Sequence, residues 1–208
     1  MDALANYSYS DSFHHAHHRY LDDNVLATLA EIRWADGPRR VFELGCGNGS
    51  FTNIMSQRGY SVTAIDPSVK GIEYARQNVP GVIFANASAY DDLAAQYGQF
   101  RAVVSLEVVE HVFEPRKYAR CVFDLLEPGG IAIISTPYHS YLKNLALALA
   151  GKMDAHFTAL WDFGHIKFWS IRTLGMLLAE TGFENVRFKR VGRMPALAKS
   201  MIATARRP

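Results

Sequence analysis

The stretch Val41-Phe-Glu-Leu-Gly-Cys-Gly-Asn-Gly49 joins an apolar run, interrupted by one acid, to three glycines at alternate positions. The run from Val41 to Leu44 is typical of a buried strand. Three alternating glycines allow a sharp turn in which a ligand can press against bare backbone. A helix is expected to begin near Ser50, so its amino end faces whatever the turn holds. The order of strand, glycine turn and helix indicates a nucleotide-binding site.

The spacing of the glycines separates two kinds of nucleotide site. A dinucleotide site has the pattern G-x-G-x-x-G, and Ser50 stands where its last glycine would be. The pattern here is an acid followed by G-x-G-x-G, which resembles motif I of the class I S-adenosylmethionine-dependent methyltransferases. The resemblance implies that S-adenosylmethionine is the cofactor. The residues of this motif that we expect at the cofactor are Glu43, Gly45, Cys46, Gly47, Asn48 and Gly49.

A second acid follows the next expected strand, residues 61–65, whose side chains alternate between polar and apolar. Asp66 lies about 20 residues past the glycines, where an acid accepts hydrogen bonds from both ribose hydroxyls of a bound nucleotide. Pro67 fixes the exit of the chain and is counted with the cofactor contacts. Ser68 can cap the helix expected from Val69. A helix cap is the alternative role for Asp66, but Ser68 already supplies it.

The resemblance also places the adenine ring. Residues 84–89 fall where class I enzymes usually carry an acid that meets the adenine amino group, but this chain has Ser88 there. Adenine contacts are therefore expected from the Ser88 hydroxyl and from backbone amides near Ala89. Leu106, at the end of the fourth expected strand, would lie against the ring, with an ordinary core position as the alternative. Glu107, which follows it, is counted with the cofactor contacts.

Alternating strand and helix patterns predict an α/β fold with a doubly wound, mostly parallel seven-stranded sheet. This is the Rossmann-like arrangement of class I methyltransferases, with an antiparallel C-terminal edge strand and a helical lid insertion. Strands are expected at 40–44, 61–65, 81–85, 100–106, 131–135, 186–191 and 200–205. Helices are expected at 20–34, 50–58, 69–78, 116–126 and 171–181. We expect one methyltransferase domain over 1–208, with an N-terminal cap region at 1–35 and the lid insertion at 136–169.

Bulk composition favours a single cytoplasmic domain. The 208 residues are 49% apolar, enough for one α/β core, and the net charge of +2 is too small to indicate nucleic acid. The two cysteines suit a reducing compartment, and the first thirty residues lack the apolar region of a signal peptide. The apolar stretch 141–150 is too short to span a bilayer. It is expected to form a buried lid helix, with peripheral contact to a membrane surface as the alternative.

The segment Ser105-Leu-Glu107-Val-Val-Glu110-His111 follows the fourth expected strand, where open α/β sheets place their chemistry. It resembles the E-x-x-E-H segment of small-molecule methyltransferases, including the ubiquinone-biosynthesis O-methyltransferases. If the segment turns helically, Glu107, Glu110 and His111 share one face. His111 is the candidate general base, because histidine can accept the proton of an acceptor hydroxyl near neutral pH.

Two other interpretations of this segment stay open. The two carboxylates and the imidazole could hold a divalent ion, as in family members that methylate RNA 3′ ends or quinone precursors, with His165 as an extra ligand. Many small-molecule members have the same segment with no metal implied, and we assign no metal site. The structural alternative is that Glu110 and His111 cap the turn before Pro115.

The lid insertion is rich in aromatic residues and histidines, which suits a flat or lipophilic acceptor, although packing onto the sheet is the alternative for most of them. His165 is the second catalytic candidate, because it shortly precedes the helix start at Ser170 and can point into the cleft. In the N-terminal cap region, Arg19 can pair with the cofactor carboxylate. The cluster His14–His18 is assigned no role.

The sequence therefore predicts an S-adenosylmethionine-dependent methyltransferase that methylates oxygen on a small aromatic, quinol-like or lipophilic acceptor. The alternatives are a metal-assisted RNA 2′-O-methyltransferase and a non-catalytic cofactor-binding protein. A nucleic-acid partner is not expected, because basic residues are dispersed except for Arg187, Lys189, Arg190 and Arg193 near the end. The glycine spacing disfavours a nicotinamide dehydrogenase.

Overall fold

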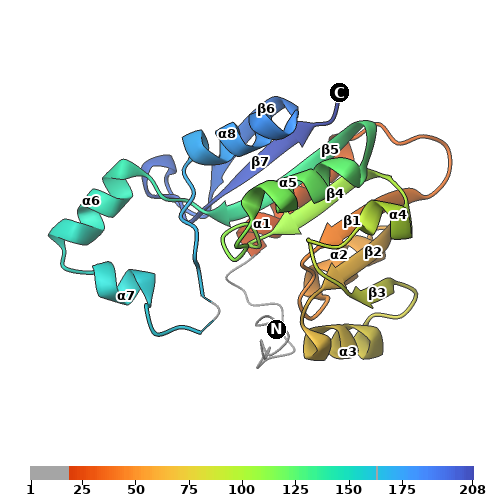
Figure 1. Ribbon diagram of the computed structural model, residues 1–208, viewed down its shortest axis with the longest axis horizontal. Coiled ribbons are helices and arrows are strands. Elements are labelled where there is room, and N and C mark those ends of the chain that lie inside the picture. Colours follow the sequence, from red (N-terminus) through yellow and green to blue (C-terminus); the bar gives the residue numbers. More distant parts are fainter. Residues whose placement is uncertain (1–18, 163) are drawn as a thin grey trace.

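The computed structural model describes residues 19–162 and 164–208. They form a seven-stranded sheet in the order β3-β2-β1-β4-β5-β7-β6, with helices on both of its faces (Figure 1). The strands are β1 (Arg39–Leu44), β2 (Tyr60–Asp66), β3 (Ile83–Asn86), β4 (Phe100–Leu106), β5 (Leu126–Pro137), β6 (Glu184–Val191) and β7 (Ser200–Arg206). Strands β1 to β5 pair in parallel, and β7 runs antiparallel to both β5 and β6. The predicted mostly parallel, doubly wound sheet with an antiparallel C-terminal edge is confirmed.

Two apolar cores cover the two faces of the sheet. The helices are α1 (Arg19–Glu31), α2 (Ser50–Gln57), α3 (Val69–Asn78), α4 (Leu93–Tyr97), α5 (Pro115–Asp124), α6 (Tyr141–Leu149), α7 (Met153–Phe157) and α8 (Ile171–Thr181). Because side chains alternate along a strand, Phe42 and Leu44 face the core under α4, α5 and α8, whereas Val41 faces the core under α1, α2 and α3. Short helix α4, which Asp92 caps, was not predicted.

The predicted boundary between the helix at 116–126 and the strand at 131–135 was wrong. Helix α5 ends at Asp124 and β5 begins at Leu126, which pairs with Phe100 across the sheet. The Pro128-Gly129-Gly130 sequence lies inside β5, where the ladder with β4 shifts register. Gly129 has a φ of 78° and donates its N–H to the carbonyl of Arg207. The glycines therefore form a bulge within the strand and do not terminate the helix.

The lid insertion contains α6 and α7, which stand beside the sheet at the left of Figure 1. None of the residues of α6 is buried, and the side chains of Tyr141 and Leu149 are 80% and 81% exposed. The prediction of a buried lid helix was wrong, because α6 projects past the sheet and no element of the described residues covers its outer face. Among residues 19–162 and 164–208, no helix has the length and apolar character needed to cross a membrane.

The sheet order places two loops at one edge. The chain passes from β1 outward to β2 and β3, and then returns to the other side of β1 to form β4. The strand order thus reverses between β1 and β4, and ligands of open α/β sheets bind at such a switch point. The glycine turn follows β1 and the E-x-x-E-H segment follows β4, so both loops lie at this position.

Candidate active site

The glycine turn after β1 depends on backbone that other residues rarely adopt. Gly45, Gly47 and Gly49 have φ values of 86°, 55° and 77°. A Cβ atom on Gly45 would come within 2.3 Å of Val108 Cγ2, and one on Gly49 would come within 2.8 Å of Ala75 Cβ. The first contact shows that the glycine turn touches the loop after β4. The second brings the turn against α3.

Asp66, at the end of β2, is bonded to the glycine turn itself. Its Oδ2 accepts the N–H of Gly47 and its Oδ1 accepts the N–H of Ser68, both at 2.8 Å. Burial raises the pKa of this carboxyl, whose residue is 6% exposed. The Ser68 hydroxyl accepts the N–H of Gly71 and caps α3, as the sequence predicted. Each Asp66 oxygen keeps a second lone pair. The hydrogen bond from a ribose hydroxyl to this lone pair remains a prediction.

Glu43 is buried within β1, where its carboxylate accepts a short hydrogen bond from the Thr52 hydroxyl. This bond ties the first turn of α2 to the strand before the glycines. Burial raises the pKa of Glu43 to about 8. Cys46 is also buried, and its pKa is raised for the same reason. Asn48 Oδ1 accepts the N–H of Ser50 at 3.2 Å and shapes the entry to α2.

The expected adenine segment forms a tight turn. The Ser88 N–H donates to Asp91 Oδ2 at 2.7 Å, and the Ser88 hydroxyl accepts the N–H of Tyr90 at 3.3 Å. Ala89 and Leu106 are half-buried, and Leu106 packs against the core under α1, α2 and α3. The sequence missed Asn86, whose amide donates to the carbonyls of Asp66 and Pro67 at 3.0 and 2.9 Å.

The segment after β4 does not turn helically at its start. Glu107 has a φ of 54°, which directs its carboxylate toward β5 and β7. The Ser135 hydroxyl donates to Glu107 Oε1 at 2.7 Å, and the Ser200 hydroxyl donates to Oε2 at 3.5 Å. Burial raises the pKa of Glu107 to about 7. The expectation that Glu107 shares a face with Glu110 and His111 was therefore wrong.

Glu110, His111 and His165 come together. Each offers one ligand atom, and these atoms all lie within 4.8 Å of one another. The rings of His111 and His165 are 4.9 Å apart, and His165 Nε2 lies 4.0 Å from Glu110 Oε1. Glu110 is 1% exposed, and neither of its carboxylate oxygens has a hydrogen-bond partner in the described part of the chain. The structural alternative for Glu110, a cap on the turn, is therefore wrong.

Burial sets the charges of this cluster. It raises the pKa of Glu110 well above its usual range, and the neighbouring Glu107 carboxylate raises it further. Burial lowers the pKa of His165 to about 4, with a smaller contribution from His111. Near neutral pH, His165 is therefore an uncharged imidazole. His111 Nδ1 lies 3.2 Å from the carbonyl oxygen of Gly164.

Backbone bonds hold the end of the lid insertion along the loop after β4. The N–H groups of Ile166 and Lys167 both donate to the carbonyl of Glu110, at 2.9 and 3.0 Å. The buried indole of Trp169 donates its Nε1–H to the carbonyl of Val109 at 3.0 Å. These bonds carry His165 to His111 from a distant part of the sequence. The predicted role of Arg19 concerns a side chain that the structure does not describe, and the cluster His14–His18 lies outside the described residues.

Comparison with known proteins identifies the family. A family model described as a methyltransferase domain matches residues 13–187. The ubiquinone biosynthesis O-methyltransferase of Caulobacter sp. (strain K31) is 36% identical over 126 residues, which cover 59% of this chain and 48% of that protein. The enzyme of the same name from Thiobacillus denitrificans is 32% identical over 149 residues, 64% of each chain. The chain spans about half the length of the Caulobacter relative.

Solved structures show the same fold. A magnesium protoporphyrin IX methyltransferase from Synechocystis, crystallised with bound S-adenosylhomocysteine, is 20% identical with a TM-score of 0.69, over 96% of this chain and 91% of that one. A SAM-dependent methyltransferase from Archaeoglobus fulgidus is 15% identical with a TM-score of 0.69, over 90% and 93%. The chain therefore belongs to the methyltransferase domain family and has the class I fold of enzymes that use S-adenosylmethionine.

Proposed function

We propose that this protein is an S-adenosylmethionine-dependent O-methyltransferase that acts on a small aromatic, quinol-like or lipophilic acceptor. The observation that carries the proposal is the contact between the glycine turn and the loop that bears His111. The space for a Cβ on Gly45 is filled by Val108, three residues before His111. We therefore expect a cofactor held by the turn to lie beside the candidate base.

The residues at the switch point fit the cofactor. S-adenosylmethionine, when bound, supplies a methyl group on a positively charged sulfonium. The turn at residues 45–49 offers bare backbone at the start of α2, and Asp66 offers acceptor lone pairs to the ribose hydroxyls. Ser88 and Ala89 are proposed to contact the adenine edge, and Leu106 its face. The proposed surroundings of the ribose and adenine also include Pro67, Glu43, Cys46 and Asn48.

His111 is proposed to remove the proton of the acceptor hydroxyl. The Gly164 carbonyl can only accept a hydrogen bond, so His111 Nδ1 carries the hydrogen in the neutral ring. Nε2 then carries the lone pair that takes the hydroxyl proton. His111 would then hold the proton that the hydroxyl gives up, and S-adenosylmethionine, when bound, would supply the methyl group that the oxygen accepts. His165, as a neutral imidazole beside His111, is proposed to orient the acceptor.

One observation favours a second way of activating the hydroxyl. Glu110, His111 and His165 present one carboxylate and two imidazoles within 4.8 Å, and the Glu110 carboxylate is buried without a partner in the described chain. This donor set suits a divalent transition-metal ion. A cation held there would lower the pKa of the acceptor hydroxyl. The 2′-hydroxyl of an RNA end is one acceptor that such a site would suit.

Methyl transfer from a labelled donor tests the proposal and separates its two modes. The acceptor panel contains phenols, catechols, quinols, fatty acids and RNA 3′ ends, each assayed with and without a chelator. We expect transfer to a hydroxyl of a small aromatic acceptor. Transfer that survives chelation supports His111 alone, and transfer that is lost and restored by Mn²⁺ supports the cation. Binding of S-adenosylmethionine with no transfer to any acceptor would contradict the proposal and favour a non-catalytic protein.

Apolar side chains on the lid suit a lipophilic acceptor. On α6, Tyr141, Leu142, Leu145 and Leu149 are 80%, 59%, 41% and 81% exposed. We propose that this face touches a lipid surface, because exposed apolar side chains gathered on one helix mark such contacts. Sedimentation with phosphatidylcholine vesicles tests it. The double variant L142E/L149E is expected to abolish co-sedimentation, and unchanged binding would contradict the contact.

A further inference from the structure

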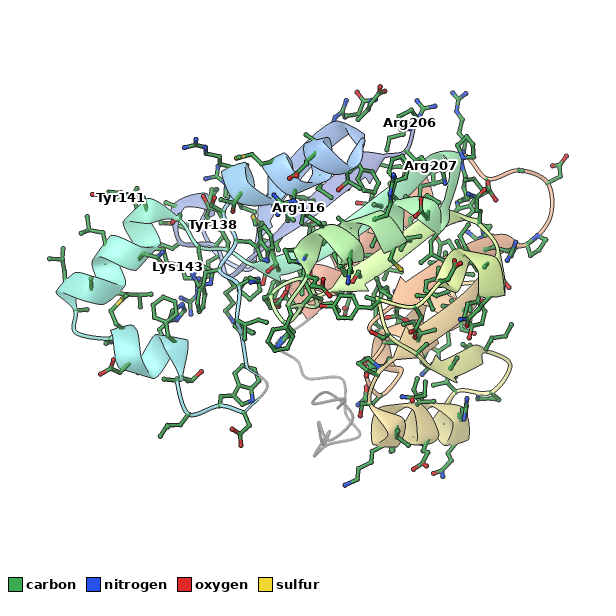
Figure 2. All side chains as sticks on the ribbon, in the orientation of Figure 1. Arg116, Tyr138, Tyr141, Lys143, Arg206 and Arg207 are labelled. Carbon is green, nitrogen blue, oxygen red and sulfur yellow. The ribbon has the colours of Figure 1, made fainter. Side chains whose placement is uncertain are left out.

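Lys143 lies at the base of the lid, on the first turn of α6. Its side chain is half-buried and its Nζ donates to the carbonyl of Tyr138 at 2.9 Å, so it turns back toward the end of β5. Tyr141, two residues earlier, is 80% exposed and points outward (Figure 2). An ammonium group has three donors. Lys143 forms no ion pair with any acid in residues 19–162 and 164–208.

The charges around Lys143 leave an excess of positive charge. Burial lowers the pKa of Lys143, and the nearby guanidinium of Arg193 lowers it further. Glu107 is the acid that opposes this effect, and its oxygens already accept hydrogen bonds from Ser135 and Ser200. His139 adds no charge near neutral pH, because burial and then Lys143 lower its pKa to about 4. An anion at this position would therefore be attracted.

His139 supplies a buried polar atom that has no partner among the described residues. It is 8% exposed, and its Nδ1 makes no hydrogen bond in the described part of the chain. The ring stacks on Phe157 with centroids 5.8 Å apart and meets the edge of Phe168 at 5.1 Å. A buried polar atom without a hydrogen-bond partner lowers stability by about 1–3 kcal/mol. Binding of a ligand that forms a hydrogen bond with Nδ1 is therefore favoured. The aromatic walls suit a flat ligand.

Two hydrogen bonds made by Trp169 link His139 to the loop that bears the candidate base. The N–H of His139 donates to the carbonyl of Trp169 at 3.1 Å, and the indole of Trp169 donates to the carbonyl of Val109 at 3.0 Å. Val109 lies two residues before His111. One side chain, Trp169, therefore spans from the base of the lid to the loop of the proposed chemistry.

We propose that Lys143 and His139 form a subsite for an anionic group on the methyl acceptor, so that the acceptor is an aromatic hydroxy acid. The subsite rests on the proposed function, because it assumes that the acceptor hydroxyl meets His111. Lys143 binds the carboxylate as a point charge and His139 Nδ1 donates a hydrogen bond to it. The nearby guanidinium of Arg193 adds to the attraction.

Equilibrium binding tests the subsite without any turnover. The probes are 3,4-dihydroxybenzoate and its methyl ester, which share the ring and the hydroxyls and differ in charge. Each is titrated calorimetrically into protein saturated with S-adenosylhomocysteine. Wild type is expected to bind the acid about tenfold more tightly than the ester, the size of one charge-assisted hydrogen bond. K143Q is expected to bind both probes equally.

Two variants control the result. K143R keeps the positive charge and is expected to retain most of the preference for the acid. K152Q removes an exposed lysine of the same lid, and is expected to behave as wild type. Equal affinity of the two probes for wild type, or a preference that survives in K143Q, would overturn the subsite. Failure of both probes to bind would overturn it as well.

The outcome separates the subsite from the proposed function. Preferential binding of the acid with no methyl transfer to it keeps the subsite and counts against the function. Methyl transfer to the acid and the ester with equal kcat/KM keeps the function and removes the subsite. The variant H139F keeps the aromatic packing and loses Nδ1, so it is expected to weaken the binding of both probes, because the carbonyl oxygen of the ester also accepts a hydrogen bond from Nδ1.

Discussion

The cofactor side and the acceptor side of this switch point are built in opposite ways. On the cofactor side, the buried acids are bonded within the protein, as Asp66 is to Gly47 and Ser68 and Glu43 is to Thr52. On the acceptor side, Glu110 and His139 hold buried polar atoms without partners among the described residues. The acids of the first region are satisfied within the protein, whereas we propose that those polar atoms of the second region bind a ligand.

The two sides also differ in how they are assembled along the chain. The glycine turn, α2 and the end of β2 come from one continuous stretch of sequence. The acceptor side joins the loop after β4 to the end of the lid through backbone bonds, such as those from Ile166 and Lys167 to Glu110. The difference predicts that changes on the cofactor side alter affinity and stability. Changes on the acceptor side should alter turnover.

The largest expected effect is on the pH dependence of stability, and it belongs to Glu43. Its pKa is about 8 in the fold against an ordinary value of 4.5, because of burial. The native state therefore binds the proton more tightly, and stability is full below pH 4.5 and falls as the pH rises toward 8. Each pKa unit corresponds to about 1.4 kcal/mol, so the loss reaches at most about 5 kcal/mol.

Urea unfolding from pH 4 to 9 measures this loss. E43Q cannot titrate, so its stability is expected to vary less with pH than that of wild type. The control is E114Q, at an exposed position. Parallel curves for wild type and E43Q would show that Glu43 is not the source of the slope.

His111→Ala sharpens the comparison from the acceptor side. Turnover is expected to fall by about 10²-fold or more, because the hydroxyl loses its base. Cofactor affinity, measured by calorimetry, is expected to stay unchanged, because the glycine turn and Asp66 keep their bonds. H156A, in the lid, removes an exposed histidine and is expected to retain turnover. Equal turnover in H111A and wild type would remove His111 from the proposed chemistry.

Asp66→Ala tests the cofactor side. Affinity for S-adenosylmethionine is expected to weaken by about 1–3 kcal/mol through lost charged hydrogen bonds. Two effects combine, because the variant also frees the N–H groups of Gly47 and Ser68. D23A, at an exposed position on α1, is the control and should bind as wild type. An unchanged dissociation constant in D66A would place the ribose elsewhere.

The same contrast explains which features of the fold and of the candidate site could be predicted from the sequence. The glycine turn and Asp66 were found because strand, turn and acid lie close together along the chain. Ser68 was correctly predicted to cap α3, since capping is also local. The seven-stranded sheet followed from alternating patterns. The sequence placed Glu110, His111 and His165 together only in the metal alternative, and it included Glu107, which the structure leaves out of the group.

The misses arise where distant contacts decide the geometry. Glu107 was placed with Glu110 and His111 by helical spacing, but its partners Ser135 and Ser200 on other strands pull it away. The exposure of α6 had no local signal, because an apolar helix looks the same whether or not a sheet covers it. Asn86 was missed because its amide bonds only to backbone carbonyls, which leave no mark in the sequence.

Glu110→Met tests whether the buried Glu110 carboxyl lowers the free energy of unfolding. The buried carboxyl has no hydrogen-bond partner in the described chain, so removal of its polar atoms is expected to raise the free energy of unfolding by about 1–2 kcal/mol. Methyl transfer should fall at the same time. E43M is the matched variant on the cofactor side, and it should be destabilised because the Thr52 hydroxyl loses its acceptor. Destabilisation of both variants would contradict the contrast.

Trp169→Phe gives the smallest expected effect and tests how the acceptor side is held. Phenylalanine keeps the buried apolar contact but loses the Nε1–H that donates to Val109, at a cost of about 1 kcal/mol in stability. The loop that bears His111 should then be less well positioned, so kcat should fall several-fold while cofactor affinity stays the same. W161F, at a half-exposed ring, is the stability control. Lost cofactor affinity with intact kcat would show that Trp169 acts on the cofactor side, and the division between the two regions would not hold.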